Sequence, residues 1–288
     1  MAERREKLLR FFGTHARKIG ILALLAAAGL TLSMKLAALQ KEDWEVQRLF
    51  ADLDSHREPP NSTEFVFARI QFTSHGPGRR NFGMARVCMP DSAPYGFYRV
   101  CGWAHDYPAA EENILQIARE ATGINLNKDS YVLARLDSDE LFRYPFGLMS
   151  EVGEMTLTER EAANLREYLN RGGFIVVDDF DGPNLEWFQE QMKMVFPDRQ
   201  FVPLTVDNPI FHTFYDVKTL EMAPPYPQRG TPKFYGYLDD HGRISMILDH
   251  NNDIGDFWEW IDEPRYDLHA SIDGLQLGID YFLYSLTH

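Results

Sequence analysis

The sequence predicts an α/β fold with a doubly wound, mostly parallel sheet. Along residues 64–288, strand and helix patterns follow one another in the order strand, helix, strand, strand, helix, strand, helix. The run Phe174–Val177 is apolar at every position, which is typical of a strand covered by helices on both faces. Hydrophobic residues make up 44% of the chain, enough for a sizeable core.

The first half of this region supplies three strands and a helix. Glu64–Phe72 alternates apolar and polar positions, which predicts a strand. Residues 73–103 are rich in Gly, Pro and Arg and favour a loop or hairpin. Gly102–Gly123 has apolar residues at helical spacing, and Gly123 suits the position after a helix. Tyr131–Asp137 predicts a strand, and Glu140–Ser150 contains another that begins near Pro145.

The second half begins with a helix signal. Thr158 and Glu161 have the spacing of a capping box, and Gly172–Gly173 marks the helix end before the strand at Phe174–Val177. A further helix is indicated by apolar residues at helical spacing before the stop at Pro197, namely Leu185, Phe188, Met192 and Val195. Residues 233–250 predict a hairpin that turns at Asp239–Gly242, within a C-terminal portion expected to be irregular.

The N-terminus has the pattern of an export signal or membrane anchor. Residues 1–18 hold six Lys or Arg and two Glu, and an uncharged run follows from Ile19 to Met34. A basic flank before an apolar run is typical of a signal peptide or signal anchor, and Leu36–Leu39 extend the run if Lys35 snorkels. We therefore expect a cytoplasmic flank at 1–18, an anchor or signal at 19–39, a linker at 40–63, and an exported domain at 64–288, anchored or released.

The charge balance limits the partners. The formal net charge is −14, and because residues 1–18 carry +4, the rest carries −18. Nucleic acid is not expected as a partner, since phosphate binding needs a basic surface. The expected partners are the membrane, through residues 19–39, and a small molecule or protein that the sequence does not name. Cys88 and Cys101 suit either one disulfide or two small buried thiols.

The candidate site lies where the buried strand ends. Three carboxylates follow Phe174–Val177 within four positions, Asp178, Asp179 and Asp181, and ligands bind outside the carboxyl ends of parallel strands. We take Asp178, Asp179, His105 and His250 as catalytic candidates. Polar or aromatic residues of two other segments are binding candidates together with Asp181: Asp106, Tyr107, Asn251, Asn252, Asp253 and Trp258.

Three interpretations of the acidic cluster stay open. It is a ligand-binding or catalytic site, a metal site, or a set of turn and cap residues, because Asp and Asn are common in turns and caps. Closely spaced carboxylates raise one another's pKa or bind a cation, and oxygen ligands suit Ca²⁺ or Mg²⁺. No EF-hand spacing is present, so we predict no metal ligands and no cofactor, and keep a divalent cation as an alternative.

The motifs in their order resemble the domain of unknown function 4159 family. They are FVFARIQF, a W-x-x-DYP-x-A-x-x-N pattern from Trp103 to Asn113, YPF, LREYLNRGGFIVVDDF, NNDIGDFWEW and GIDYFLYSLTH. The resemblance covers most of residues 64–288. It implies a flavodoxin-like or class I glutamine-amidotransferase-like fold, an N-terminal export or membrane segment, and no established activity. Because the family is bacterial, the resemblance also implies a location in the bacterial cell envelope, anchored in the inner membrane or secreted.

The resemblance places the amidotransferase nucleophile near Asp179, at the tight turn after the strand. That position is not cysteine, and Cys88 and Cys101 lie far upstream. Because glutamine hydrolysis of this type needs a thiolate, amidotransferase activity is not expected.

Three functions follow as hypotheses. The first is a non-catalytic ligand- or partner-binding domain on an amidotransferase-like scaffold, with Trp and Tyr beside Asp and Asn as a possible carbohydrate surface. The second is a hydrolase of a saccharide or amide that uses Asp178 or Asp179 with His105 or His250. The third is a structural subunit of a membrane-associated assembly.

Overall fold

The computed structural model describes residue 60 and residues 63–74, 102–261 and 264–288. The predicted flank and anchor at 1–39, nearly all of the linker, and both cysteines lie outside these residues. Among the helices of the described ranges, none is both long and apolar enough to cross a membrane.

A seven-stranded sheet with the order β2-β1-β3-β4-β7-β6-β5 forms the centre of the fold. Strands β1 (Phe67–Gln71), β2 (Tyr131–Arg135), β3 (Phe146–Ser150), β4 (Phe174–Phe180) and β7 (Ile244–His250) are parallel to their neighbours in this series. Strands β6 (Lys233–Leu238) and β5 (Val202–Pro203) continue the sheet in antiparallel fashion. The predicted mostly parallel α/β sheet is thereby confirmed.

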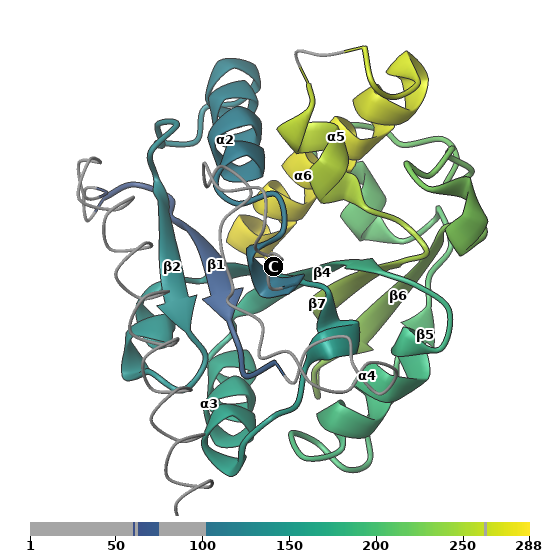
Figure 1. Cartoon of the computed structure of the whole chain (residues 1–288). Coiled ribbons are helices and arrows are strands. Elements are labelled where there is room, and N and C mark those ends of the chain that lie inside the picture. The colour runs from purple at the N-terminus through teal and green to yellow at the C-terminus, as the bar shows by residue number, and fades with distance from the viewer. Residues whose placement is uncertain (1–59, 61–62, 75–101, 262–263) are drawn as a thin grey trace, which may run out of the picture. The chain divides into compact units, whose positions relative to one another are not determined.

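Helices cover both faces of the sheet (Figure 1). Helices α2 (Ala109–Ala121), α5 (Ile254–Glu259) and α6 (Leu268–Thr287) pack against one another on one face. Helices α3 (Glu159–Asn170) and α4 (Asn184–Met192) lie on the other. This arrangement explains the apolar run in β4, whose seven residues are all buried between the two layers.

The predicted helix signal before β4 is present in full. The Thr158 side chain accepts a hydrogen bond from the Glu161 amide, and the Glu161 carboxylate accepts one from the Thr158 amide at 2.8 Å. The helix ends before Gly172, whose φ of +92° suits glycine. The predicted hairpin is β6 and β7, joined at Asp239–Gly242.

Short 3₁₀ turns connect several of these elements: η1 (Gly102–Ala104), η2 (Asp139–Arg143), η3 (Val152–Glu154), η4 (Pro209–His212) and η5 (Pro227–Arg229). The long connection from α4 to β6 contains β5, η4 and η5, which agrees with the expected irregularity there. The chain then closes with the 20-residue helix α6, a regular element that the expectation of an irregular C-terminal portion does not include.

An aromatic cluster joins α6 to the centre of the sheet. Phe282 of α6 packs edge-on against Phe146 of β3, with ring centroids 4.8 Å apart, and against Phe67 of β1 at 5.8 Å. All three side chains are fully buried. Rings of this size bury large apolar areas and favour tilted or edge-on contacts, so this cluster fixes the sheet face on which α6 lies.

Candidate functional site

Polar side chains converge at the carboxyl ends of β3, β4 and β7. We call this region the acidic edge; it comprises residues 102–108, 150–154, 178–182 and 249–256, together with Arg229 of η5. Eight of its side chains are carboxylic acids: Asp106, Glu151, Glu154, Asp178, Asp179, Asp249, Asp253 and Asp256. Seven of them are buried, and Glu151 is partly exposed.

A buried ion pair holds the segment 102–108 against the sheet. Arg69 of β1 donates from Nε to Glu111 Oε1 of α2 at 2.6 Å, and both side chains are fully buried. The Arg69 guanidinium also donates to the carbonyl of His105 at 2.6 Å and to that of Trp103 at 3.3 Å. Burial of a charge is tolerated when it is paired and hydrogen-bonded in this way. The pair fixes the backbone from which His105 projects.

Asp179 lies at the centre of the acidic edge. The pairing of β4 with β7 is irregular between Val177 and Phe180, and Asp179 has a φ of +53°. Its side chain is fully buried, and its Oδ1 accepts a hydrogen bond from the Arg229 guanidinium. Its Oδ2 lies 3.2 Å from His105 Nδ1, and the same nitrogen lies 2.8 Å from Asp106 Oδ1. The bend therefore turns one carboxylate toward both a histidine and an arginine.

Asp178, the residue before Asp179 in β4, contacts helix α5. Its Oδ2 accepts a hydrogen bond from the Gly255 amide of α5 at 2.8 Å. Burial raises its pKa to about 7, and the Asp179 carboxylate adds to the increase. A Cβ at Gly255 would stand 2.5 Å from Asp106 Oδ2, so glycine is needed for this close approach.

Asp249 of β7 forms a second buried group with Tyr281 of α6. The Tyr281 hydroxyl donates to Asp249 Oδ1 at 3.0 Å, and both residues are fully buried. Burial raises the pKa of Asp249 well above its usual value, with a further increase from the Asp178 carboxylate. Two neighbouring strands thus contribute acids that favour their protonated form.

Glu151 follows β3 directly and has a φ of +53°. Burial, Asp179 and Glu154 raise its pKa to about 8. Its amide donates to the carbonyl of Asp178 at 3.1 Å. The sequence analysis did not select this residue, although the rule that sites form where parallel strands end applies to β3 as it does to β4.

The acidic edge continues onto α5. Asp253 is the N-cap of this helix, and its Oδ1 accepts a hydrogen bond from the Asp256 amide at 3.1 Å. Asp256 Oδ2 accepts one from the Tyr266 hydroxyl at 2.7 Å. Burial raises the pKa of both acids, and neighbouring carboxylates add to the increase.

Arg229 provides the positive charge at this edge. Besides Asp179, its guanidinium lies 3.4 Å from Asp181 Oδ2 and 3.7 Å from Asp253 Oδ2. Arg229 lies in the long irregular connection between α4 and β6, where the sequence shows no periodicity or motif that would place it at this edge. It was therefore missed in the sequence analysis.

Three other predicted site residues lie at the end of β7 and directly after it: His250, Asn251 and Asn252. His250 has its Nε2 3.0 Å from the carbonyl oxygen of Gly182, and burial lowers its pKa, which favours the neutral ring. Asn251 has a φ of +58°, accepts from the Gly182 amide at 3.0 Å and donates to the Thr231 carbonyl at 3.1 Å. Asn252 donates to Met222 Sδ at 3.3 Å. These three shape the edge from β7.

Two aromatic binding candidates lie in the core instead. Trp258 is fully buried and donates from Nε1 to the carbonyl of Gly274 at 3.0 Å. Tyr107 is 1% exposed and packs edge-on against Tyr131. With their rings enclosed by protein, neither offers a face on which a sugar would stack. The prediction of an aromatic carbohydrate surface at these two residues is corrected accordingly, because Trp258 of α5 packs against Gly274 and Gly278 of α6.

Two sets of side chains at the acidic edge have ligand atoms close enough to share a cation. The sets are His105, Asp179 and Asp253, and Asp106, Asp256 and Glu259, with the atoms of each set within 4.8 Å of one another. His105, Asp106, Asp179 and Asp253 are among the predicted candidates, so the fold brings together residues that are far apart in the sequence.

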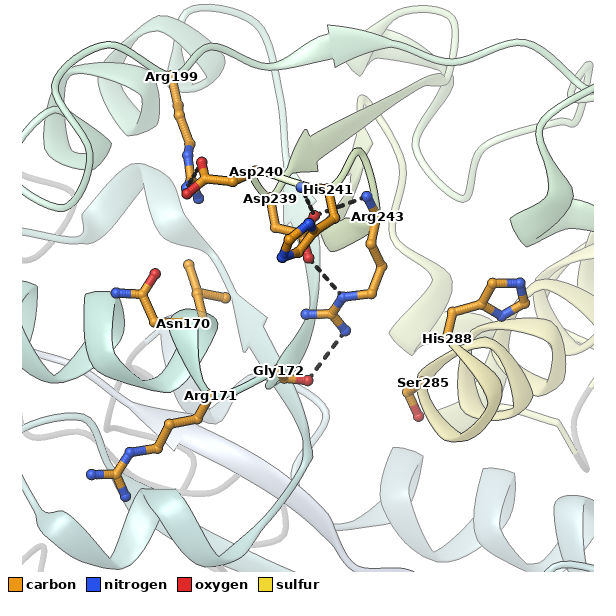
Figure 2. A pocket seen from close by; sticks show the side chains of 11 residues that line it. Asn170, Arg171, Gly172, Arg199, Asp239, Asp240, His241, Arg243, Ser285 and His288 are labelled. Atoms are coloured by element: carbon orange, nitrogen blue, oxygen red, sulfur yellow. Dashed lines mark hydrogen bonds and ion pairs between the residues drawn. The ribbon is translucent and has the colours of Figure 1, made fainter.

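A separate pocket lies at the other end of the sheet, where β4 and β7 begin (Figure 2). Its volume is about 370 Å³, and it is lined by residues that include Arg171, Arg199 and Arg243. Arg199 pairs with Asp240 at 2.6 Å and Arg243 with Asp239 at 3.0 Å. Figure 2 shows Arg199 and Arg243 beside the hairpin turn, whereas Arg171 points away from it and pairs with Glu167 of α3. Because these charges are already paired, the pocket is a weaker candidate than the acidic edge.

Fold and site together define the protein as an α/β domain with a mostly parallel sheet and a buried acid cluster at the carboxyl ends of its strands. The family model described as Domain of unknown function (DUF4159) matches residues 97–286. The chain belongs to this family, as the sequence motifs indicated. A search of the curated proteins found no match to this chain.

Proposed function

We propose that residues 64–288 are a ligand-binding domain on a flavodoxin-like or amidotransferase-like scaffold, with the acidic edge as its binding site. The parallel strands have the order β2-β1-β3-β4-β7, which corresponds to the 2-1-3-4-5 order of flavodoxin-like sheets. In such sheets, ligands bind beyond the carboxyl ends of the strands. Residue 179, at the strand end, is an aspartate, so the scaffold would lack a cysteine nucleophile there.

One observation carries the proposal: backbone strain is concentrated at this edge. In the described part of the chain, the non-glycine residues with positive φ are Asp106, Glu151, Asp179 and Asn251. They come from four separate segments, and all four lie at the acidic edge. Such conformations cost on the order of 1–3 kcal/mol each and cluster at binding and active sites. Turn and cap chemistry alone gives no reason for four strained residues to meet at one place.

The charges favour a ligand that is cationic or rich in hydroxyl groups. Acids outnumber the basic groups Arg229 and His105 at the edge, so an anion would meet repulsion. The raised pKa values of Asp178, about 7, and Glu151, about 8, allow these carboxyl groups to donate as well as accept hydrogen bonds near neutral pH. A polyhydroxylated small molecule would use both roles.

A hydrolase is the second candidate, favoured by the contact between Asp179 and His105. Asp179 lies on a strained bend at a strand end, and its Oδ2 is 3.2 Å from His105 Nδ1. A carboxylate in this place is a suitable nucleophile or general base, and the histidine a suitable proton carrier. His250 is less suited, because its Nε2 is already engaged with the Gly182 carbonyl.

The proposal includes an exported or membrane-anchored location. The basic flank and the apolar run of residues 19–39 support it. In this setting the domain would act in the cell envelope, and a structural role in a membrane-associated assembly is the alternative without a small-molecule ligand. The acidity of the chain supports the exclusion of nucleic acid as a partner.

A thermal-shift screen of the full chain tests the proposed binding site. The panel holds sugars, polyamines, nucleotides and glutamine, and each compound is tested on the wild type, Asp179→Asn and Asp198→Asn. Asp198 is an exposed carboxylate beyond α4 and serves as the matched control. A ligand at one hundred times its dissociation constant stabilises by about 2.7 kcal/mol.

We expect a compound that raises the melting temperature of the wild type and of Asp198→Asn and leaves Asp179→Asn unchanged. A shift of equal size in all three proteins would place binding elsewhere. Absence of any shift in the wild type would contradict the ligand-binding function and favour the structural role.

A further inference from the structure

Three side chains at the acidic edge meet from three separate segments. His105 follows η1, Asp179 ends β4, and Asp253 caps α5. One ligand atom from each lies within 4.8 Å of the other two. The Asp179 and Asp253 side chains are fully buried, and the His105 side chain is 30% exposed. The group is therefore closed on the protein side and open on the side of His105.

Three buried carboxylate oxygens at this place accept no hydrogen bond, although His105 Nδ1 lies 2.8 Å from one of them and 3.2 Å from another. Asp179 Oδ2 and Asp253 Oδ2 are both inaccessible and accept no hydrogen bond, although the second oxygen of each residue does. Asp106 Oδ1, beside His105, is in the same condition. Burying a charged oxygen without a partner is costly unless a cation compensates it. These oxygens are thus placed to bind a positively charged ligand, which acidity alone would not indicate.

Arg229 does not replace that ligand. Its guanidinium is engaged with Asp179 Oδ1, and its distance to Asp253 Oδ2 is 3.7 Å, beyond hydrogen-bond range. A hydrogen bond to the non-coordinating oxygen of a carboxylate is a common way to orient a metal ligand. Arg229 therefore leaves Asp179 Oδ2 available and fixes its direction.

The spacing of one pair of these atoms, His105 Nδ1 and Asp179 Oδ2, suits ligands of one metal ion. His105 Nδ1 and Asp179 Oδ2 are 3.2 Å apart. Two ligands about 2.1 Å from one metal ion are separated by roughly 3.0 Å in octahedral geometry and roughly 3.4 Å in tetrahedral geometry. The observed distance falls between these values. An imidazole ligand favours first-row transition metals over Mg²⁺ and Ca²⁺, which prefer oxygen ligands alone.

We propose that His105, Asp179 and Asp253 bind a divalent first-row transition-metal ion, such as Zn²⁺ or Mn²⁺. Three protein ligands leave at least one coordination position open on the side of His105, where an oxygen of a polyhydroxylated ligand would bind. The inference rests on the proposed function, since it places the ion in the same ligand site. It differs from the expectation that a cation here would be Ca²⁺ or Mg²⁺, because it includes an imidazole ligand.

Equilibrium dialysis of the full chain tests the metal site. After removal of metals with EDTA, the wild type, His105→Gln, Asp253→Asn and the control His241→Gln are dialysed against Zn²⁺, Mn²⁺ or Mg²⁺. His241 lies in the exposed turn before β7. His105→Gln changes a partly exposed side chain and so keeps the test valid if Asp253→Asn fails to fold.

We expect a Zn²⁺ or Mn²⁺ site in the wild type and His241→Gln whose affinity exceeds that for Mg²⁺. Its affinity should fall by at least about 100-fold in His105→Gln, since changes even to residues outside the coordination shell lower metal affinity 10- to 100-fold. No transition-metal binding in the wild type, or equal binding in His105→Gln and His241→Gln, would overturn the proposal.

Repeating the ligand panel with EDTA separates this inference from the proposed function. A panel compound that still stabilises the wild type in EDTA, together with no metal binding, overturns the metal site and supports the ligand site. Metal binding that depends on His105, with no response to any panel compound, supports the metal site and overturns the organic-ligand function.

Discussion

At the scale of single residues, the acidic edge combines strained backbone with acids held in an unfavourable environment. Asp178 and Asp179 were selected from the sequence because three carboxylates directly follow a buried strand. Arg229 and Glu151 were not, because each lies in a short segment without periodicity or a motif. Spacing in the sequence identifies site residues that follow one strand directly. Site residues that come from other loops cannot be identified in this way, because their position depends on how the chain folds.

Glu151→Gly tests whether the strain at the edge is real. Glu151 has a φ of +53° and a pKa raised to about 8 by burial and by nearby acids. A left-handed conformation costs roughly 1–2 kcal/mol for a non-glycine residue, and glycine loses about 0.5–1 kcal/mol in chain entropy. Removing a carboxyl group that lies beside Asp179 and Glu154 adds to the gain, so we expect the free energy of unfolding to rise by about 1 kcal/mol in urea denaturation at pH 7.

The matched control is Glu167→Gly on the exposed side of α3. Its backbone is helical and its exposed side chain pairs with Arg171 at 2.8 Å, so glycine should lower the free energy of unfolding by about 1 kcal/mol. If both variants are destabilised equally, the left-handed residues at the acidic edge are not strained.

At the scale of secondary-structure elements, the central elements were predicted and the last helix was not. Strand β4 was expected at Phe174–Val177 and extends to Phe180, because its last residues pair with β7 through an irregular register. Helix α6 has buried residues on several sides, among them Ile279, Tyr281 and Phe282, so a single apolar stripe does not mark it. Periodicity identifies half-buried elements more readily than enclosed ones.

Asp280 gives α6 a pH-dependent link to the segment after η4. Its Oδ1 accepts hydrogen bonds from the amides of Phe214 and Tyr215, each at 2.8 Å, and burial raises its pKa to about 6. Because the folded pKa lies above the unfolded value, its stabilising contribution is complete below about pH 4 and is lost as pH rises through about 6.

Asp280→Asn should remove this part of the pH profile while an amide oxygen keeps accepting the two hydrogen bonds. We expect the free energy of unfolding of the wild type to fall relative to the variant by roughly 1 kcal/mol per pH unit between pH 4 and 6, measured by urea titration. Asp198→Asn, which alters an exposed carboxylate, should run parallel to the wild type. A parallel profile for Asp280→Asn would show that Asp280 does not titrate in this interval.

At the scale of the whole molecule, the mostly parallel sheet determines where a site can form. Strands β1, β3, β4 and β7 all end at the same edge of the sheet, so the polar segments that follow them must meet there. This is why the sequence predicted the location of the site better than the full set of residues that form it. The convergence of His105, Asp179 and Asp253 depends on the placement of the loop before α2, which Arg69 and Glu111 fix from inside the fold.

The fold offers two candidate locations for a ligand, at opposite ends of the strands. One is the acidic edge, and the other is the arginine-lined pocket at the start of β4 and β7 (Figure 2). Strain and buried oxygens without a hydrogen bond are found at the first, whereas each arginine of the second is paired with a nearby carboxylate. The central claim is that binding takes place at the acidic edge.

Hydrogen–deuterium exchange of the full chain tests this claim most directly, with and without the panel compound that stabilises it most. Binding at the acidic edge predicts slower exchange in residues 102–108, 178–182 and 249–256, because amides of bound segments open less often. Slower exchange confined to residues 170–173 and 239–243 would contradict the account and assign binding to the arginine-lined pocket.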